Sequence, residues 1–456
     1  MKQRTLALLL AGAMVVSLLA AGALAAEGEP ADSSAEQVED AVPAEEEPAA
    51  VSEEPADLPQ SEPREEDEGL EEDGEDLEVS VEEYIPDPVG SISFTNLNRR
   101  MHESNLQVLA IQESIDILEE LDYDDLKEEL RLQLNELAGA QWMMVIMDMD
   151  GTLAYEQMKQ AYSSLREQFD AIKDGDMQAD NAETIRQLRN LQNQIIMAGE
   201  ATYIALAAME IQEDGLERQL TALNRQLTEL QLRYKLGHIS SMTLKQTQAG
   251  RAALTSGLST LRMNLDTYKG QLELLIGADI TGNISLGALP KVTQQELDGM
   301  DLERDLETAK ENSWDLYEAT ETMKEEKKIY EGRGGDRAYD YKQDNRTYMQ
   351  TRHNWHAAKY TYDNTVQNFE LGLRNLYLKV QDYKQVLDAA KTALAVEQDN
   401  YAVAQLKQSQ GTLSRNGLLE AEDKLKEARE KVAGAENDLF SAYNTYRWAV
   451  DYGIMN

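Results

Sequence analysis

The sequence contains no cysteine and very little proline after its first fifth. Without cysteine, neither a disulfide scaffold nor a thiolate metal site can form. Eight of the nine prolines lie between Pro30 and Pro88, and the ninth is Pro290. Because proline interrupts helices, this distribution favours very long helices after residue 89. It disfavours an enzyme built from alternating strands and helices.

Basic residues are also scarce, since 43 Lys and Arg stand against 85 Asp and Glu, a net charge of −42. Such a charge disfavours nucleic-acid binding. Residues 27–90 alone contain 26 acidic residues and one basic residue, Arg64. That composition cannot bury a core. We therefore predict a disordered, acidic, proline-rich linker over residues 26–90, and we favour a solvated spacer over a wall-spanning tether or an ion-attracting brush.

The N-terminus has the pattern of a secretory signal. Lys2 and Arg4 precede an uncharged apolar stretch from Thr5 to about Ala26, and Ala23-Leu-Ala25 fits a small-residue cleavage site. We predict a signal peptide over residues 1–25 and export of the chain; an uncleaved anchor is the alternative. No cysteine follows the stretch, which excludes a lipoprotein anchor.

One short pattern occurs twice, 174 residues apart. It reads Gly237-His-Ile-Ser240-Ser-Met-Thr-Leu244 and then Gly411-Thr-Leu-Ser414-Arg-Asn-Gly-Leu418. The glycine can adopt a positive φ where a helix ends, and the serine three residues later can cap the next helix. A single copy is equally well explained as an ordinary corner. Two copies in register favour duplicated helical hairpins whose tips share one role.

Apolar residues recur every three or four positions on both sides of each copy, as in coiled-coil packing. Before and after the first copy they are Leu216, Leu220, Leu223, Leu227, Leu230, Tyr234, Leu254, Leu258, Leu261, Leu265, Tyr268, Leu272 and Leu275. We predict an all-α fold of long antiparallel hairpins. The expected domains are helical repeat 1 over 91–279, a linker over 280–295 and helical repeat 2 over 296–456.

The spacing predicts further helices within each repeat. In the first they cover about 94–121, 124–147, 152–173 and 182–236, with a loop from Asp174 to Asp180. In the second they cover about 302–330 and 337–408, separated by a turn at 332–335. The last of these would be on the order of 100 Å long. A compact domain does not need such a rod, so we expect a protein that spans a distance.

With duplication, heptads and tips together, residues 92–453 resemble the TolC-like outer-membrane efflux protein family. Its tips carry Gly-x-x-Ser-x-x-Asp-Leu, although Thr243 and Gly417 stand here where the family has Asp. The segments Ile92–Asn105 and Ala309–Ser313 also resemble the family's first helices. No segment shows the ten-residue alternation of barrel strands. The first repeat instead holds about 33 extra residues. We expect a divergent member that lacks the barrel strands.

The resemblance implies a homotrimeric tube whose tips dock a periplasmic or extracytoplasmic adaptor protein, fed by an ABC or other efflux transporter. The contact residues it implies are Gly237, Ile239, Ser240, Gly411, Leu413 and Ser414. It implies no cofactor and no catalysis. The expected location is the cell envelope: the outer membrane if a barrel exists, otherwise the cell wall, the surface or the exterior. A surface or wall-associated coiled-coil spacer without a transport role is the alternative.

Two patterns suggest other chemistry. Val145-Ile-Met-Asp148-Met-Asp150-Gly-Thr152-Leu resembles the phosphate-site motif of haloacid dehalogenase-type phosphatases, in which the first Asp is the nucleophile. Only about 26 residues separate it from the acidic stretch at Asp174, too few for the α/β region such an enzyme needs. His353 and His356 share a helix face but have no third ligand nearby. We therefore predict neither an enzyme nor a metal site.

Overall fold

The computed structural model describes residues 86–455. These residues lie in the second of two units into which the chain divides, Val81–Asn456. The predicted signal peptide, and all but the end of the predicted acidic linker, lie outside the described residues.

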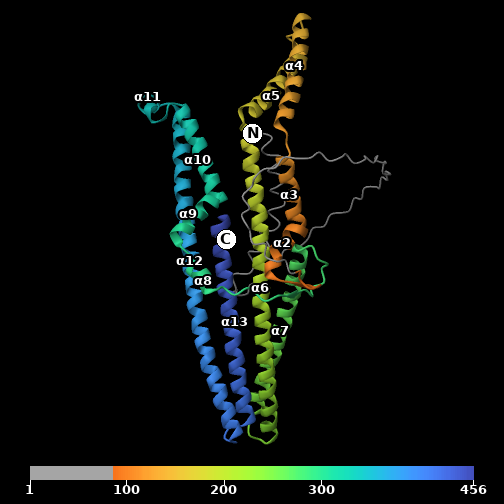
Figure 1. Ribbon diagram of the computed structural model, residues 1–456, viewed down its shortest axis with the longest axis vertical. Coiled ribbons are helices and arrows are strands. Elements are labelled where there is room, and N and C mark those ends of the chain that lie inside the picture. Colours follow the sequence, from red (N-terminus) through yellow and green to blue (C-terminus); the bar gives the residue numbers. More distant parts are fainter. Residues whose placement is uncertain (1–85, 456) are drawn as a thin grey trace, which may run out of the picture. The chain divides into compact units, whose positions relative to one another are not determined.

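The described residues form mostly helices, which confirms the predicted all-α class (Figure 1). In chain order the helices are α2 (Phe94–Ser104), α3 (Leu106–Glu119), α4 (Tyr123–Ile146), α5 (Leu153–Asp174), α6 (Asp176–Lys235), α7 (Ser241–Leu275), α8 (Gln294–Asp298), α9 (Leu302–Asn312), α10 (Trp314–Gly332), α11 (Tyr339–Lys342), α12 (Arg346–Ser409) and α13 (Arg415–Tyr452), with the 3-10 turn η1 (Gly335–Ala338) before α11. Within residues 86–455 the strands are β1 (Ser91–Ile92) and β2 (Ser285–Leu286), which pair in parallel.

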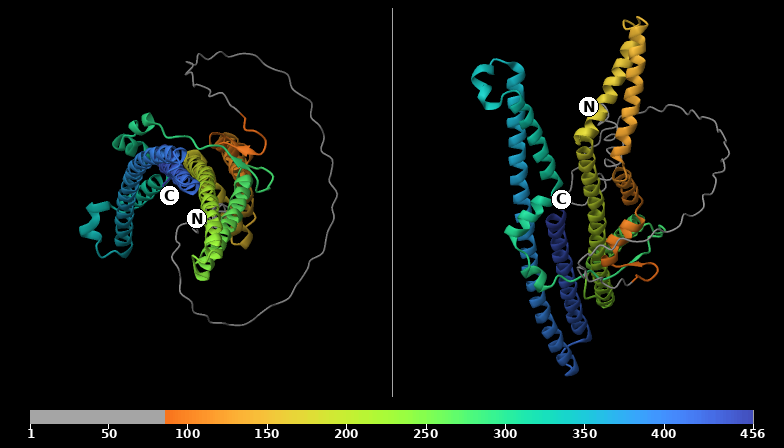
Figure 2. Two further views of the ribbon diagram at one scale, coloured as in Figure 1. Left: turned by 90° about the horizontal axis from the view of Figure 1, so that it is seen from below. Right: turned by 45° about the horizontal axis from the view of Figure 1, so that its top comes forward.

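Four long helices lie side by side in the order α7, α6, α13, α12. Seen from below, they form a curved row (Figure 2). The helices α6 and α12 have 60 and 64 residues, so each is on the order of 100 Å long. In this row α7 and α12 are the outer helices, and each has a long neighbour on one side only.

The second repeat follows the first element by element. Helices α2 and α9 have 11 residues each. Each is followed, after one residue, by a second helix, α3 or α10. The hairpin of α6 and α7 then corresponds to the hairpin of α12 and α13. The predicted duplication of long antiparallel hairpins is therefore confirmed.

Each repeat bends at the single residue between its first two helices. Asn105 accepts hydrogen bonds from the backbone N–H groups of Gln107 and Val108, and its amide donates to the carbonyl of Leu275 at 2.9 Å. Ser313 caps α10 in the second repeat by accepting from the N–H of Leu316. The expectation of unbroken helices over 94–121 and 302–330 is wrong, because these capping side chains start a new helix.

A glycine ends the last helix of each repeat and lies against the bend of the same repeat. Gly277 and Gly453 have φ of 64° and 65°. A Cβ at Gly277 would lie 2.6 Å from the carbonyl oxygen of Ser104, and one at Gly453 would lie 2.3 Å from the Cα of Ser313. Only glycine leaves room for this backbone contact. The two repeats therefore share the same close contact between the glycine that ends the last helix and the bend between the first two helices.

Each repeat has its own apolar core, and α13 connects the two. The first-repeat core includes Leu272 and Tyr203 but also Trp448 from α13. Buried Glu200 on α6 accepts hydrogen bonds from the indole N–H of Trp448 at 2.6 Å and from the amide of Asn444 at 2.8 Å. This carboxylate therefore joins the two repeats across the centre of the row.

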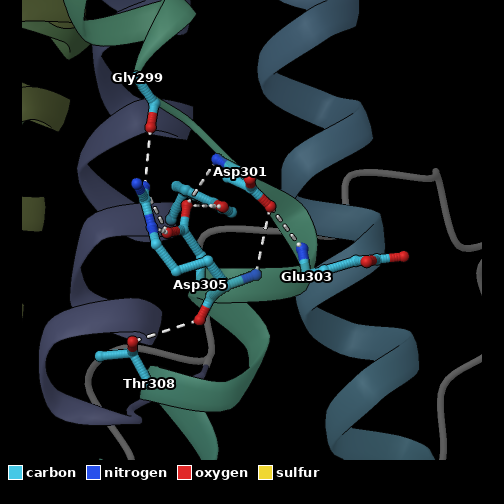
Figure 3. A network of polar contacts seen from close by, with 7 residues as sticks. Gly299, Asp301, Glu303, Asp305 and Thr308 are labelled. Carbon is cyan, nitrogen blue, oxygen red and sulfur yellow. Dashed lines mark hydrogen bonds and ion pairs between the residues drawn. The ribbon is translucent and has the colours of Figure 1, made fainter.

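The two repeats anchor their first helices differently. Before α2, the hydroxyl of Tyr203 donates to the carbonyls of Ile92, the last residue of β1, and Gly287, the residue after β2. Burial raises the pKa of that hydroxyl to about 12. At the start of α9, Asp301 caps the helix while Asp305 accepts from the N–H of Asp301 (Figure 3).

The carboxylate of Asp305 is buried in this second anchor. It accepts a hydrogen bond from the hydroxyl of Tyr446 at 2.7 Å and pairs with the guanidinium of Arg304 at 2.8 Å. Burial, together with the hydrogen bond to Asp305, raises the pKa of Tyr446. The start of α9 is thereby tied to α13.

Two helix boundaries differ from the predicted ones. Helix α6 begins at Asp176, so the expected loop from Asp174 to Asp180 is reduced to Gly175, whose φ is 84°. Acidic residues there suit the start of a helix because the helix dipole attracts them. Helix α12 begins at Arg346 rather than near 337, because η1 and α11 occupy the intervening residues.

One stretch of α6 is long and apolar enough to cross a membrane by length and composition. Core helices pass the same test. Because Ile196, Tyr203 and Leu206 of α6 are buried in the first-repeat core, we interpret the stretch as core.

Candidate functional site

The first tip is a corner in which every residue of the repeated pattern has a structural role. Gly237 has a φ of 78°, and its N–H donates to the carbonyl of Tyr234 at 2.9 Å. The N–H of His238 donates to the carbonyl of Arg233 at 2.8 Å. These two bonds form a Schellman motif, which ends α6. The hydroxyl of Ser240 then accepts from the N–H of Thr243 at 3.2 Å and begins α7.

The second tip repeats this geometry. Gly411 has a φ of 75°, and the N–H groups of Gly411 and Thr412 donate to the carbonyls of Gln408 and Lys407 at 3.0 and 2.9 Å. The hydroxyl of Ser414 accepts from the N–H of Gly417 at 3.1 Å and begins α13. The predicted positive φ of both glycines and the predicted serine caps are confirmed.

The apolar residues of the pattern occupy matching positions as well. Ile239 and Leu413 each precede the capping serine, and Leu244 and Leu418 each lie four residues after it. These are the two positions of a hydrophobic staple, which fixes the angle at which the chain enters a helix. The pattern thus specifies a corner, and a partner would meet the side chains that the corner leaves exposed.

The structure brings the two tips together at one end of the row, here called the hairpin end (residues 231–248 and 403–419; Figure 1). The amide of Asn416, beside the second tip, donates to the carboxylate of Glu229 near the first at 3.4 Å. Farther along the same seam, Arg225 pairs with Asp423, and Arg218 pairs with Glu430 at 2.8 Å. These contacts join α6 to α13.

The hairpin end is basic although the chain as a whole is strongly acidic. Its two segments contain five Lys or Arg residues and no Asp or Glu. All five side chains are exposed: Arg233, Lys235, Lys245, Lys407 and Arg415. Arg233 pairs with Glu229 just outside the first segment. The remaining positive charge would favour a partner with an acidic surface.

Other exposed residues of the hairpin end were not among the predicted contact residues. Leu236 and Met242 at the first tip are 61% and 63% exposed, and Leu406 before the second is 58% exposed. Gly237, Ser240, Gly411 and Ser414 serve the corner itself. Searching for apolar residues off the heptad stripe could have found the exposed ones.

Both outer helices of the row expose apolar residues on the face away from their neighbour. On α12, Leu371, Leu378, Val396 and Val403 are 49–62% exposed. At 100° per residue they fall within about 40° of one another, on the side opposite the buried Leu373 and Val380 residues. This exposed line of residues is called the α12 stripe below.

The exposed face of α7 has a different composition. Between Met242 and Met263 it carries small residues, listed by position as Ala249, Ala252, Ala253, Ser256 and Thr260. Helix α7 contains no acidic residue before Asp266. Larger side chains on α12 and smaller ones on α7 could interdigitate, because helices pack by placing ridges of side chains into grooves. This surface is called the α7 face below.

The phosphatase-like pattern lies at a corner between two helices. Asp148 has a φ of 58° and Asp150 is exposed, both between the end of α4 and the start of α5. A strand before the first Asp, which the enzyme motif requires, is absent from this part of the described chain. No group of three or more His, Asp or Glu side chains within residues 86–455 could hold a metal ion. His356 instead lies against Trp355 and Tyr360.

No family model matches the sequence, and no curated protein matches it either. Solved structures of outer-membrane channels do match the fold. The CmeC outer membrane channel of Campylobacter jejuni has 13% identity and a TM-score of 0.46, over 65% of this chain and 68% of that one. VceC of Vibrio cholerae has 11% identity and a TM-score of 0.44, over 79% and 96%. CusC has 12% identity and a TM-score of 0.46, over 79% and 96%.

The similarity to TolC-like outer-membrane channels that the tips predict is therefore found among solved structures.

Proposed function

We propose that this protein is an exported, non-enzymatic, TolC-like helical conduit of an efflux or secretion system, and that it docks an adaptor protein through its hairpin end. The observation that carries this proposal concerns the two edges of the row. Each edge has no long helix beside it: the α12 stripe at one edge and the α7 face at the other. Copies of the chain would join through these edges into a closed wall around a passage.

The two edges differ from each other, so one copy's α12 stripe would meet the α7 face of the next copy. An interface between two different patches generates a ring when the rotation closes and a filament when it does not. The curved row of four helices supports a ring (Figure 2). A trimer is the number that the resemblance to TolC-like proteins implies.

The chain's lack of cysteine allows a direct test of the ring. Val396 of the α12 stripe and Ser256 of the α7 face both lie about four turns from their tips. With Val396→Cys and Ser256→Cys in one chain, mild oxidation should give a covalent ladder that ends at three copies. Each single variant is the control and should stay uncross-linked. A chain that neither cross-links nor exceeds the monomer mass in light scattering would contradict the proposal.

The adaptor would meet the exposed residues of the hairpin end. Because that end is basic, its partner should present acidic residues, and their association should weaken as salt rises. The double variant Lys245→Glu with Arg415→Glu should lose pull-down of an adaptor without loss of the helical circular-dichroism signal. Lys359→Glu with Lys391→Glu, exposed on α12 away from the tips, is the matched control. Unchanged pull-down by the tip variant would exclude docking there.

The same experiments separate the conduit from the coiled-coil spacer. A spacer needs neither a closed ring nor an adaptor. A stable monomer with an intact hairpin end would favour the spacer.

A further inference from the structure

The hairpin formed by α4 and α5 exposes a group of large apolar residues near its corner. Trp142, Val145 and Ile146 are 65%, 48% and 58% exposed, and Met143 and Met147 beside them are also exposed. Soluble proteins seldom leave so many neighbouring apolar side chains in water, and such patches mark interaction sites. Together with Ala138 and Gly139, the residues Trp142, Val145 and Ile146 are called the collar below.

The collar has the spacing of a helix-packing surface. Its residues recur at intervals of three and four along α4, which places them on one face. That face differs from the one that packs on α5, where the amide of Gln141 donates to the carbonyl of Met158 at 3.1 Å. Nothing lies within 4 Å of the space that a Cβ on Gly139 would occupy. The small residues beside Trp142 leave room for another helix to approach closely.

The charge and length of this part of α4 indicate that the collar packs against another helix and not within a lipid bilayer. The uncharged run Leu137–Met147 has 11 residues, about 16 Å of helix, too short to cross a hydrocarbon core. Asp148 and Asp150 stand at the corner, ahead of the collar. Their carboxylates would enter a bilayer first, at high cost. Side-by-side packing on another helix leaves both carboxylates in water.

A second copy of the chain meets these requirements without any other partner. Each copy carries the same uncharged collar, so two collars can pack while the acidic corners stay apart. Resting on the proposed function, the ring would also hold neighbouring collars at a high effective concentration. A different partner protein would have to compete with this high effective concentration of collars.

We propose that the α4–α5 hairpins of neighbouring copies pack together through their collars, and so form a second contact between copies at the end of the molecule opposite the hairpin end. The contact buries the collar and leaves the Asp148–Gly151 corner exposed.

The test uses single cysteines in the full chain. Val145→Cys lies in the collar, and Gln160→Cys lies on the exposed side of α5. Under mild oxidation Val145→Cys should give covalent dimers, whereas Gln160→Cys should not. Adding Trp142→Glu and Ile146→Glu to Val145→Cys should abolish the dimer, with the circular-dichroism signal unchanged.

Parallel measurements separate the outcomes. If the Val396 and Ser256 cysteine pair cross-links while Val145→Cys does not, the ring stands and the collar contact is refuted. If neither cross-links and the chain has the mass of a monomer in light scattering, the ring of the proposed function fails as well. Flotation of the unsubstituted chain with phosphatidylcholine vesicles, lost on Trp142→Glu, would also refute the collar contact and assign the collar to lipid.

Discussion

In the first repeat, the chain beyond the far end of α6 forms the hairpin of α4 and α5. The apolar residues near the corner of this hairpin are exposed to water. In the second repeat, the corresponding helix α12 begins at Arg346 after the short turn of η1 and α11, and Tyr330 of α10 and Tyr348 of α12 are buried beside that turn. There the hydroxyl of Tyr348 donates to the carbonyl of Gly335 at 2.8 Å, and Trp355 stacks on Tyr330 at 5.2 Å. The second repeat thus completes its own far end, whereas the first leaves a surface for another chain.

At the hairpin end the two repeats hardly differ. Both tips use the same glycine geometry and the same serine cap. Duplication has therefore kept the tips and the bends alike, while the far ends differ in length, polarity and exposure. Four measurements of stability test this difference between the two repeats.

The largest loss of stability is expected at Trp448, a residue of the second repeat that is buried in the first-repeat core. Trp448→Ala removes a buried indole from the first-repeat core and takes one of two donors from Glu200. We expect a loss of about 3–5 kcal/mol in the free energy of unfolding, as for other buried aromatic truncations. Chemical denaturation measures it. Tyr341→Ala, at an 87% exposed aromatic residue, is the control and should change stability by less than about 0.5 kcal/mol.

The glycines beneath the two bends should respond alike. Gly453→Ala and Gly277→Ala force a Cβ against backbone atoms at 2.3 and 2.6 Å and strain a positive φ. Each should destabilise the chain by about 2–4 kcal/mol. Gly434→Ala, in α13 with nothing within 4 Å, should be neutral or stabilising by up to about 1 kcal/mol. A loss of stability in only one of these two variants would show that the glycine–bend contacts of the two repeats are not equivalent.

Glu273 belongs to the first repeat, where its buried carboxylate holds the chain segment that follows α7. Burial opposes ionisation of this carboxylate, but hydrogen bonds from Gly282, Thr281 and Asn283 outweigh burial and lower its pKa below the usual 4.5. Its contribution to stability is therefore complete above about pH 4.5 and is lost as the pH falls further.

Glu273→Gln should destabilise the chain at pH 7 by about 1–3 kcal/mol, because it weakens several hydrogen bonds to a buried group. It should also flatten the acid side of the stability profile. Thermal unfolding at several pH values measures both effects. Exposed Glu420→Gln is the control, and an equal acid dependence in the two variants would contradict the role of Glu273.

The smallest effects concern the tips. Ser240→Ala and Ser414→Ala each remove one helix cap, which typically costs about 1 kcal/mol. Hydrogen exchange at the first turns of α7 and α13 should rise by the same factor in both variants. Unequal factors would show that the tips differ energetically despite their matching geometry.

Spacing along the sequence predicted the long helices and the corners, because heptads and caps are local properties. The bends at Asn105 and Ser313 could not be predicted in this way. Each bend depends on a contact with the end of a helix far along the chain, such as the bond from Asn105 to Leu275, 170 residues away. The acidic stretch after Asp174 was predicted as a loop because its composition is polar, although acids also suit a helix start.

The candidate site was predicted only in part. The tip residues were found from their pattern, since the corner needs those residue types. The α12 stripe was missed because both faces of α12 carry apolar residues, and periodicity does not tell which face has a neighbour. The basic character of the hairpin end was hidden by the charge of the whole chain.

The tips have a further consequence for how such a protein can change. The residues that form each corner are Gly, Ser and two apolar residues, whereas the residues facing outward, such as His238 and Met242, form a separate set. Binding preference can therefore be altered by exchanging outward side chains while the corner folds as before. Because two such corners lie side by side, the outward residues of one can be substituted while the other keeps its contact with the original partner.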